Sequence, residues 1–221
     1  MASLPLVAVL HLAMAHAPQV APETIATFAQ VESGLNPYAL YDNTAKKSYQ
    51  PTSAAEASAL AKSLLEKGHS IDTGLMQINS ANFRWVGLDH ITAFDPARSV
   101  KAGAEILKEA YLRCADQSLS ADALRCAASI YNTGNHKRGE TNGYVAKIYK
   151  AADTLVPAIR EAIQGQAAPP IAPAQSQAAP PHGCGPPPPS WDSWATTAYK
   201  RCIRKPQATT PQSETPKNEV Q

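Results

Sequence analysis

The chain of 221 residues has the length of one domain with an additional segment, and its 44% of hydrophobic residues is enough for a core. Twenty Lys and Arg residues against 18 Asp and Glu residues give a net charge of only +2, without the clustered cations that nucleic-acid binding requires. No apolar run approaches the ~20 residues of a membrane-spanning helix, so we expect no membrane-spanning segment.

Prolines divide the chain into dissimilar parts. Seven of the 19 prolines fall in residues 1–164 and twelve in the remainder, and residues 1–164 are neutral, with 15 cationic and 15 acidic side chains. We therefore predict a folded domain over residues 1–164 and a Pro- and Ala-rich linker over residues 165–190. Residues 191–221 are predicted to be a short, largely disordered tail with the potential to bind a partner.

Residues 4–17 are apolar and allow two interpretations. They resemble the apolar region of a signal peptide that ends at Ala15-His16-Ala17, although no Lys or Arg precedes Lys46. They also fit a first helix of the domain, because their apolar residues recur at helical spacing. The residues of this stripe are Leu6, Val9, Leu10, Ala13 and Ala17.

Helical patterns dominate the rest of the domain. A helix is predicted to begin near Pro22 and end at Gly34, and Ser53-Ala-Ala-Glu56 is a capping box for another that ends at Gly68. Strand patterns are nearly absent, and only residues 48–52 suggest a minor strand. Further helices are predicted from apolar stripes in residues 100–114, 124–131 and 145–155, with an interruption near Pro157 and a possible cap at Ser120. These patterns predict a mostly α fold.

The four cysteines form two local pairs, Cys114 with Cys126 and Cys184 with Cys202. None has C-x-x-C spacing or a histidine at a zinc-ligand interval, so we expect no metal site. The pairs favour short-range disulfides in an oxidising compartment, with reduced cytosolic thiols as the alternative. No dinucleotide, nucleotide-phosphate or zinc-protease motif is present, and we expect no cofactor.

Glu32 is the most informative residue of the chain. Helical spacing places it on the buried stripe with Ile25, Phe28 and Ala29, where a carboxylate is unusual. It also lies in the last turn of its helix, where the helix dipole disfavours a negative charge. Both effects raise a carboxyl pKa, as a general acid at neutral pH requires. A partly buried glutamate that bonds to the backbone remains the alternative on position alone.

Two further segments carry polar groups that suit uncharged sugars. Asp72-Thr-Gly-Leu-Met-Gln-Ile-Asn79 combines a glycine and apolar residues with the amides of Gln77 and Asn79. Ser129-Ile-Tyr-Asn-Thr-Gly134 ends a helix with a phenol beside an amide. Amides and phenols can hydrogen-bond the hydroxyl and N-acetyl groups of a polysaccharide.

Together these motifs resemble soluble lytic transglycosylases, and more closely the peptidoglycan-cleaving transglycosylases of type IV secretion and conjugation systems (VirB type). The resemblance covers about residues 4–155, and Thr73, Ile130 and Thr133 differ from the residues that many members carry. It implies a lysozyme-like helical domain of the goose-type and soluble lytic transglycosylase kind. The segments that carry it are Glu32-Ser33-Gly34, Asn36-Pro37, Gly74-Leu-Met-Gln77 and Tyr131-Asn-Thr-Gly134.

The resemblance implies cleavage of the β-1,4 bond between N-acetylmuramic acid and N-acetylglucosamine, with formation of 1,6-anhydro-N-acetylmuramic acid. Such a periplasmic enzyme would open the cell wall locally for the secretion apparatus. It assigns Glu32 as the acid, Tyr131 to a hydrogen bond that orients it, and Met76 to the floor of the cleft. Asp72 is expected to anchor its loop. The residues expected to bind substrate are Ser33, Thr73, Met76, Gln77, Asn79 and Asn132, and Asn79 has a loop-holding role as its alternative.

Two competing functions stay open at this stage. One is a lysozyme-type hydrolase of the same fold. The other is a non-catalytic peptidoglycan-binding assembly factor that recruits secretion-channel subunits through Trp191 and Trp194. The resemblance also favours residues 4–17 as a retained helix and leaves the route of export open.

Overall fold

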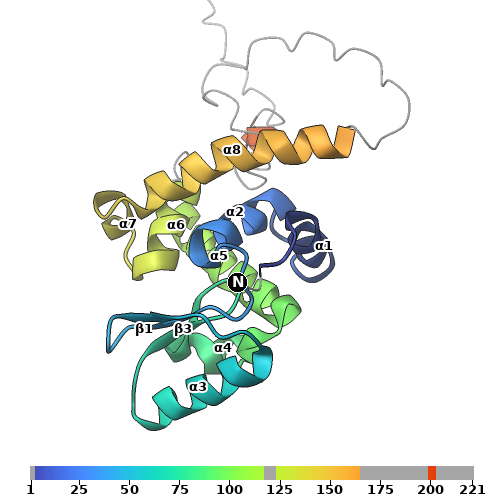
Figure 1. Cartoon of the computed structure of the whole chain (residues 1–221). Helices are drawn as coiled ribbons and strands as arrows, with labels where there is room; N and C mark the ends of the chain where they lie inside the picture. The colour runs from blue at the N-terminus through green and yellow to red at the C-terminus, as the bar shows by residue number, and fades with distance from the viewer. Residues whose placement is uncertain (1–2, 117–122, 165–198, 203–221) are drawn as a thin grey trace, which may run out of the picture.

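Helices surround one main core, and a small sheet with helix α3 lies at the end of the molecule opposite helix α8 (Figure 1). The structure, a computed structural model, describes residues 3–116, 123–164 and 199–202. The longer helices are α1 (Leu6–His16), α2 (Pro22–Ser33), α3 (Ala54–Glu66), α5 (Pro96–Asp116), α6 (Ala123–Thr133) and α8 (Tyr144–Gln164). The short ones are η1 (Ser80–Asn82), α4 (Phe83–Val86), η2 (Thr92–Phe94) and α7 (Arg138–Thr141).

The helix boundaries follow the local sequence signals. Pro22 occupies the first turn of α2, and Gly34 ends this helix in the left-handed conformation, with φ of 62°. The predicted cap of α3 forms, because the Glu56 amide donates to the Ser53 hydroxyl at 3.2 Å. The Glu56 carboxylate accepts at 2.8 Å from the amide of Thr52, one residue before the position expected in a capping box. The predicted mostly α, lysozyme-like fold is confirmed. The predicted cap at Ser120 and the tail from residue 165 to 198 lie outside the described residues.

A four-stranded antiparallel sheet is the element that the sequence patterns largely missed. Its strand order is β2-β1-β3-β4, and each strand is only two or three residues long. Segments this short carry too little alternation to be distinguished from loops. The strands are β1 (Leu40–Asp42), β2 (Lys47–Tyr49), β3 (Ile71–Thr73) and β4 (Ile78–Asn79).

Helix α8 also differs from the prediction. It runs from Tyr144 to Gln164 without the interruption that was expected near Pro157. Val156 and Ile159, on either side of this proline, are buried. Their packing holds the helix together where the proline removes a backbone hydrogen bond. The apolar stripe therefore outweighs the proline.

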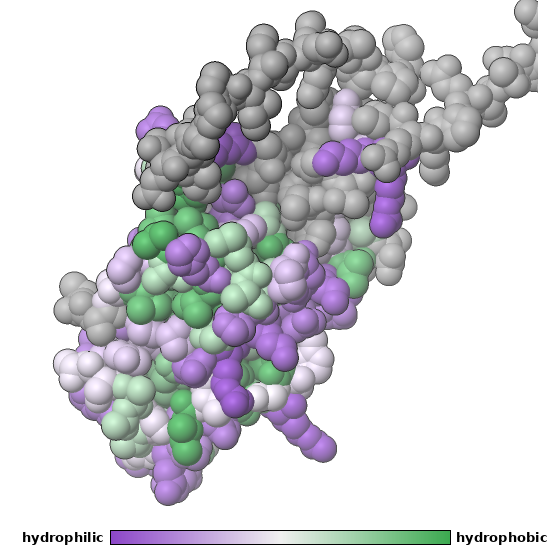
Figure 2. All heavy atoms as spheres, turned by 90° about the vertical axis from the view of Figure 1, so that its right-hand side faces the viewer, coloured by the Kyte–Doolittle hydropathy of each residue, from purple (hydrophilic) through white to green (hydrophobic). Residues whose placement is uncertain are grey.

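Helix α1 is an integral part of the core. Val9, Ala13 and Ala17 are fully buried, and α1 packs against α2 and α5. On its other side, Val7 and Met14 are more than half exposed, and the face of the molecule on which α1 lies shows apolar side chains among polar ones (Figure 2). Removal of residues 4–17 would uncover part of this core. None of the helices in the described ranges combines the length and apolarity needed to cross a membrane.

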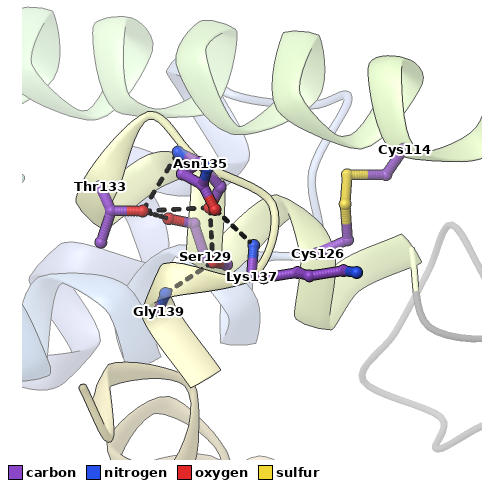
Figure 3. The surroundings of a disulfide bond; sticks show 7 residues. All are labelled: Cys114, Cys126, Ser129, Thr133, Asn135, Lys137 and Gly139. Atoms are coloured by element: carbon purple, nitrogen blue, oxygen red, sulfur yellow. Dashed lines mark hydrogen bonds between the residues drawn. A yellow bond between two sulfur atoms is a disulfide. The ribbon is translucent and has the colours of Figure 1, made fainter. Parts of the chain in front are cut away.

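A disulfide ties α5 to α6, the pair of helices that pack most extensively. Cys114 in α5 is bonded to Cys126 in α6, and the 12-residue separation makes this a local staple (Figure 3). This confirms the first predicted pairing. Cys202 is also disulfide-bonded, and Cys184, its expected partner, lies outside the described residues.

The core position of α1 predicts a large difference between two valines of the same helix. Val9→Ala removes two buried methyl groups and is expected to cost about 2 kcal/mol, which lowers Tm by about 6 °C. Val7→Ala, on the exposed side, is expected to leave Tm almost unchanged. Thermal unfolding of both variants, purified from the periplasm and checked by mass, measures the effect. Equal Tm values for the two variants would show that the mature protein lacks this helix.

Candidate active site

Glu32 lies where two adjoining cavities meet. Each has a volume of about 400 Å³. One extends toward the β1–β2 hairpin, with Tyr41, Ser48 and Gln50 in its wall, and we call it the hairpin arm. The other extends between α4, α5 and the end of α6, and we call it the helix arm. The residues common to both arms are Glu32, Asn43, Asp72, Gln77 and Asn132. The acid therefore lies part-way along a groove, with room for ligand on either side.

The surroundings of Glu32 hold its carboxyl near the midpoint of ionisation at neutral pH. Its pKa is raised to about 7, mainly by burial, and the nearby Asp72 carboxylate acts in the same direction. The hydrogen bond from Tyr144 and the charge of Lys147 act in the opposite direction. Burial has the largest effect, so a substantial fraction of the carboxyl groups stays protonated at neutral pH. This agrees with the direction expected from the sequence.

Tyr144, at the start of α8, donates the hydrogen bond to Glu32. This corrects the prediction for Tyr131, whose hydroxyl instead donates to the backbone oxygen of Met76 at 2.8 Å. A phenol has a single proton, so Tyr131 does not donate to Glu32 while this bond is formed. Its ring packs edge-on against that of Phe28 in α2, with 5.2 Å between the ring centroids. Tyr131 therefore supports the helix and the loop beside the acid.

The loop over residues 74–77 is fixed tightly against α2 and α5. Gly74 has a φ of 75°, and a Cβ there would lie 2.2 Å from the backbone oxygen of Ala93, so only glycine fits. The Ser33 hydroxyl donates to the backbone oxygen of Leu75 at 2.7 Å. The amide of Gln77 donates to the backbone oxygens of Ala39 and Gly74. The Ser33 hydroxyl proton is therefore used in binding the loop. Both amide hydrogens of Gln77 are also used within the protein, so only its side-chain oxygen remains to accept a hydrogen bond from a ligand.

Two of the predicted substrate contacts are wrong. Thr73 is completely buried, and its hydroxyl donates to the backbone oxygen of Ile78 at 3.1 Å. Alternation along β3 explains this, because Asp72 faces the groove and its neighbour must face the opposite side. Met76 is also completely buried, and its side chain packs on Gly103 of α5 rather than on the cleft floor.

The remaining predicted amides lie in the groove. Asn79 lines the helix arm and donates to the Asp72 carboxylate at 2.7 Å, and this bond holds β4 against β3. Asn132 lines both arms and accepts from the amide of Asn142 at 3.0 Å, which leaves its own amide protons toward the groove. Burial raises the pKa of Asp72, and the hydrogen bond from Asn79 acts in the opposite direction. The loop-anchoring role expected for Asp72 agrees with this bond.

The end of α6 is positioned by a compact hydrogen-bond cluster. The Ser129 hydroxyl donates to the backbone oxygen of Asn135 at 2.6 Å and accepts from the Gly139 amide at 2.7 Å (Figure 3). A Cβ at Gly139 would lie 2.5 Å from the Ser129 Cα, so α7 needs glycine there to approach α6. Thr133 donates to the Ser129 backbone oxygen at 2.7 Å. This cluster fixes the backbone that carries Asn132 into the groove.

Comparison with known proteins decides the family. The family model described as the transglycosylase SLT domain matches residues 10–153 of the chain. The chain belongs to this family. The VirB1 protein of Rhizobium radiobacter is 42% identical over 151 residues, which are 68% of this chain and 63% of that protein. That of Agrobacterium fabrum is 44% identical over 144 residues, 64% and 58% of the two chains.

A type IV secretion system protein VirB1 of Brucella abortus is 37% identical over 170 residues, 71% of each chain. The chain thus spans a little under two thirds of the length of the first two relatives, and most of the third. No solved structure matches the chain. The residues that align include the whole groove, from α2 to the start of α8.

Sequence reasoning missed several residues in or beside the groove, among them Tyr144, Asn43 and Trp85. Tyr144 is 112 residues from Glu32 in the chain and adjoins Gly143, which resembles an ordinary helix start. Asn43 follows a strand too short to be recognised. Trp85 lies in the four-residue helix α4, which is too short to leave a periodic pattern. Of these three, only Trp85 offers a signal in the sequence, its aromatic side chain.

The Tyr144 bond predicts a shift in the acidity of Glu32. Tyr144→Phe removes a hydrogen bond that favours the carboxylate, so the pKa of Glu32 is expected to rise by about one pH unit. Carboxyl ¹³C NMR over a pH series measures it, with the Glu32→Gln spectrum identifying the signal. Tyr131→Phe is the matched control and is expected to produce a smaller shift, because its hydroxyl donates elsewhere. A larger shift for Tyr131→Phe would contradict this assignment.

Proposed function

We propose that this chain is a peptidoglycan lytic transglycosylase that opens the cell wall in the periplasm for a type IV secretion or conjugation apparatus. The observation that carries the proposal is a carboxyl with a pKa of about 7, held part-way along an amide-lined groove. The SLT-domain match and the VirB1 relatives support the same activity and the same cellular setting.

The first step uses protonated Glu32 as a general acid. It donates its proton to the glycosidic oxygen as the bond from that oxygen to C1 of N-acetylmuramic acid breaks. The N-acetyl group of the same sugar stabilises the positive charge at C1, so this route needs no second enzyme carboxylate. The glycan with the new hydroxyl group then leaves.

The second step uses the same residue as a base. Glu32, now ionised, takes the proton of the 6-hydroxyl group, and the freed oxygen bonds to C1 to close the 1,6-anhydro ring. The proton given in the first step is thereby recovered, and no water is consumed. The phenol of Tyr144 stabilises the carboxylate between the two steps, and burial keeps its pKa high enough to be reprotonated.

The polar groups of the groove hold the glycan strand. In this proposal Asn132 donates to, and Gln77 accepts from, the N-acetyl and hydroxyl groups of the sugars on either side of the acid. Ser33 acts one step removed from the substrate, through the loop that carries Gln77. Asp72 is bonded by Asn79, which favours an anchoring role over that of a second carboxylate in a lysozyme-type hydrolase.

Residues 165–221 are proposed to serve a partner rather than the reaction. Their composition supports a linker over residues 165–190 and a segment over residues 191–221 in which Trp191 and Trp194 contact secretion-channel subunits. The catalytic domain of residues 1–164 contains the whole groove. The two parts are therefore expected to be separable.

Glu32→Gln is the direct test of the acid. The amide cannot exchange a proton with the glycosidic oxygen, so release of muropeptides from purified sacculi is expected to fall by a factor of at least about 100. Mass spectrometry of the wild-type products is expected to give muropeptides one water lighter than those of a hydrolase. Full activity of Glu32→Gln, or products of hydrolase mass, would contradict the proposal.

The same variant has a predicted effect on stability, with a defined sign. Folding raises the pKa of Glu32 from 4.5 to about 7, so the free energy of unfolding of the wild type decreases as the pH rises through this range. Glu32→Gln removes this loss. Its Tm is expected to match that of the wild type at pH 4 and to exceed it at pH 8. The corresponding difference in the free energy of unfolding approaches about 3 kcal/mol at most.

Deletion of residues 165–221 tests the proposed division of labour. Muropeptide release by the shortened protein is expected to equal that of the full chain, whereas conjugative or secretory transfer is expected to fall. The double variant Trp191→Ala, Trp194→Ala keeps the chain length and serves as the matched comparison. Unchanged transfer with both variants would restrict the function to the enzyme domain.

A further inference from the structure

The helix arm has features that a bare polysaccharide groove does not need. One of its walls is a single face of α5, because Ile106, Glu109, Ala110 and Arg113 recur at helical spacing. The facing wall is the end of α6, from Ile130 to Gly134. Trp85 from α4 lines the same arm. The apolar side chains of this face of α5 thus lie beside the indole of Trp85 and the charged groups of Glu109 and Arg113.

Trp85 is held open to solvent in the wall of this arm. Its side chain is 57% exposed, although α4 is anchored beside it by the buried Phe83. A single exposed tryptophan is unremarkable by itself, but this one lines a groove beside the acid. An indole face in a polysaccharide groove offers the C–H bonds of a sugar ring a flat, polarisable surface with a partial negative charge. Its position suits a sugar one or more subsites away from Glu32.

Arg113 is an exposed cation in the same arm. Within the described ranges neither Arg113 nor Glu109 forms an ion pair, whereas Arg125 on α6 makes a bidentate pair with Glu140 at 2.9 and 2.8 Å. The next residue, Cys114, is bonded to Cys126, which fixes this end of α5 against α6. Arg113 thus starts from a rigid backbone and presents a guanidinium whose geometry matches a carboxylate.

We propose that the helix arm is a subsite for a peptide-substituted sugar, in which Trp85 stacks on the sugar ring and Arg113 binds a carboxylate of the stem peptide. The proposal rests on the proposed function, because it takes peptidoglycan as the substrate class. In peptide-bearing strands the sugars themselves offer no anion for Arg113, because each lactyl carboxyl is consumed in the amide bond to the peptide. The stem peptide supplies carboxylates beside the strand. Trp85 and Arg113 therefore determine specificity and take no part in proton transfer.

The kinetic test compares glycan strands that carry stem peptides with the same strands stripped by an amidase. Arg113→Gln is expected to raise KM about tenfold on peptide-bearing strands, the cost of a charged hydrogen-bonded pair, and to leave kcat nearly unchanged. Arg113→Lys is expected to recover part of the loss. Lys101→Gln makes the same charge change on α5, at an exposed residue outside the groove, and is the matched control.

The stripped strands present a new free carboxylate on each lactyl group, near the ring. Binding of this group by Arg113 would give Arg113→Gln an equal effect on both substrates, which would overturn the assignment to the stem peptide. No effect on either substrate would overturn it as well. Trp85→Ala is expected to raise KM about tenfold on both substrates, and Trp85→Phe to recover most of it. An unchanged KM for Trp85→Ala would remove Trp85 from the subsite.

Binding without turnover separates this proposal from the proposed activity. In full-length protein with Glu32→Gln, Trp191→Phe and Trp194→Phe, Trp85 is the only indole, because the chain has three tryptophans. Peptide-bearing strands are expected to shift its fluorescence saturably, with Kd about tenfold higher after Arg113→Gln. Saturable binding with a silent Trp85 would overturn the subsite. If the expected fluorescence shift occurs but the wild-type enzyme releases products of hydrolase mass, only the proposed activity is contradicted.

Discussion

The burial of one ionisable carboxyl is the constraint on which the rest of the groove depends. Glu32 lies in the last turn of α2, where burial and the helix dipole both disfavour its negative charge. Tyr144 opposes this only in part. A fully satisfied carboxylate would be a poor acid, and a carboxyl without any partner would ionise too reluctantly to act as a base. The single phenol bond keeps the two forms close in free energy.

The surrounding architecture serves to bring Tyr144 and the loop of residues 74–77 to this carboxyl from distant parts of the chain. Helix α8 packs on α2 and carries Tyr144 at its first residue, while Ser33 and Tyr131 bind successive carbonyl groups of the loop. Both contacts to the loop use a hydroxyl donor on a helix and a backbone oxygen of the loop. Several residues that the sequence motifs mark as functional therefore act on the backbone of the groove, and fewer of them are available to touch a ligand.

The sequence predicted the helices and the acid because both leave local signals. Glu32 interrupts an apolar stripe, and the cap at Ser53 and the glycine after α2 mark helix ends within a few residues. The direction of side chains within the loop motif was not predictable in this way. Thr73 adjoins Asp72 in β3 but faces the interior, since neighbouring residues of a strand point to opposite sides. Met76 adjoins Gln77 in the turn of residues 74–77, where no periodic pattern indicates which side chain is buried. Tyr144 was missed because a contact across 112 residues has no local pattern.

Helix α8 has one further property that follows from connectivity. Its first residue holds the carboxyl of Glu32, and its last described residue, Gln164, leads to the proline-rich part of the chain. The covalent connection between the catalytic domain and residues 165–221 therefore runs through this helix. Helix α8 is continuous and packs on α2 and α6. The element that sets the acidity of the site is thus also the one to which the rest of the chain is joined.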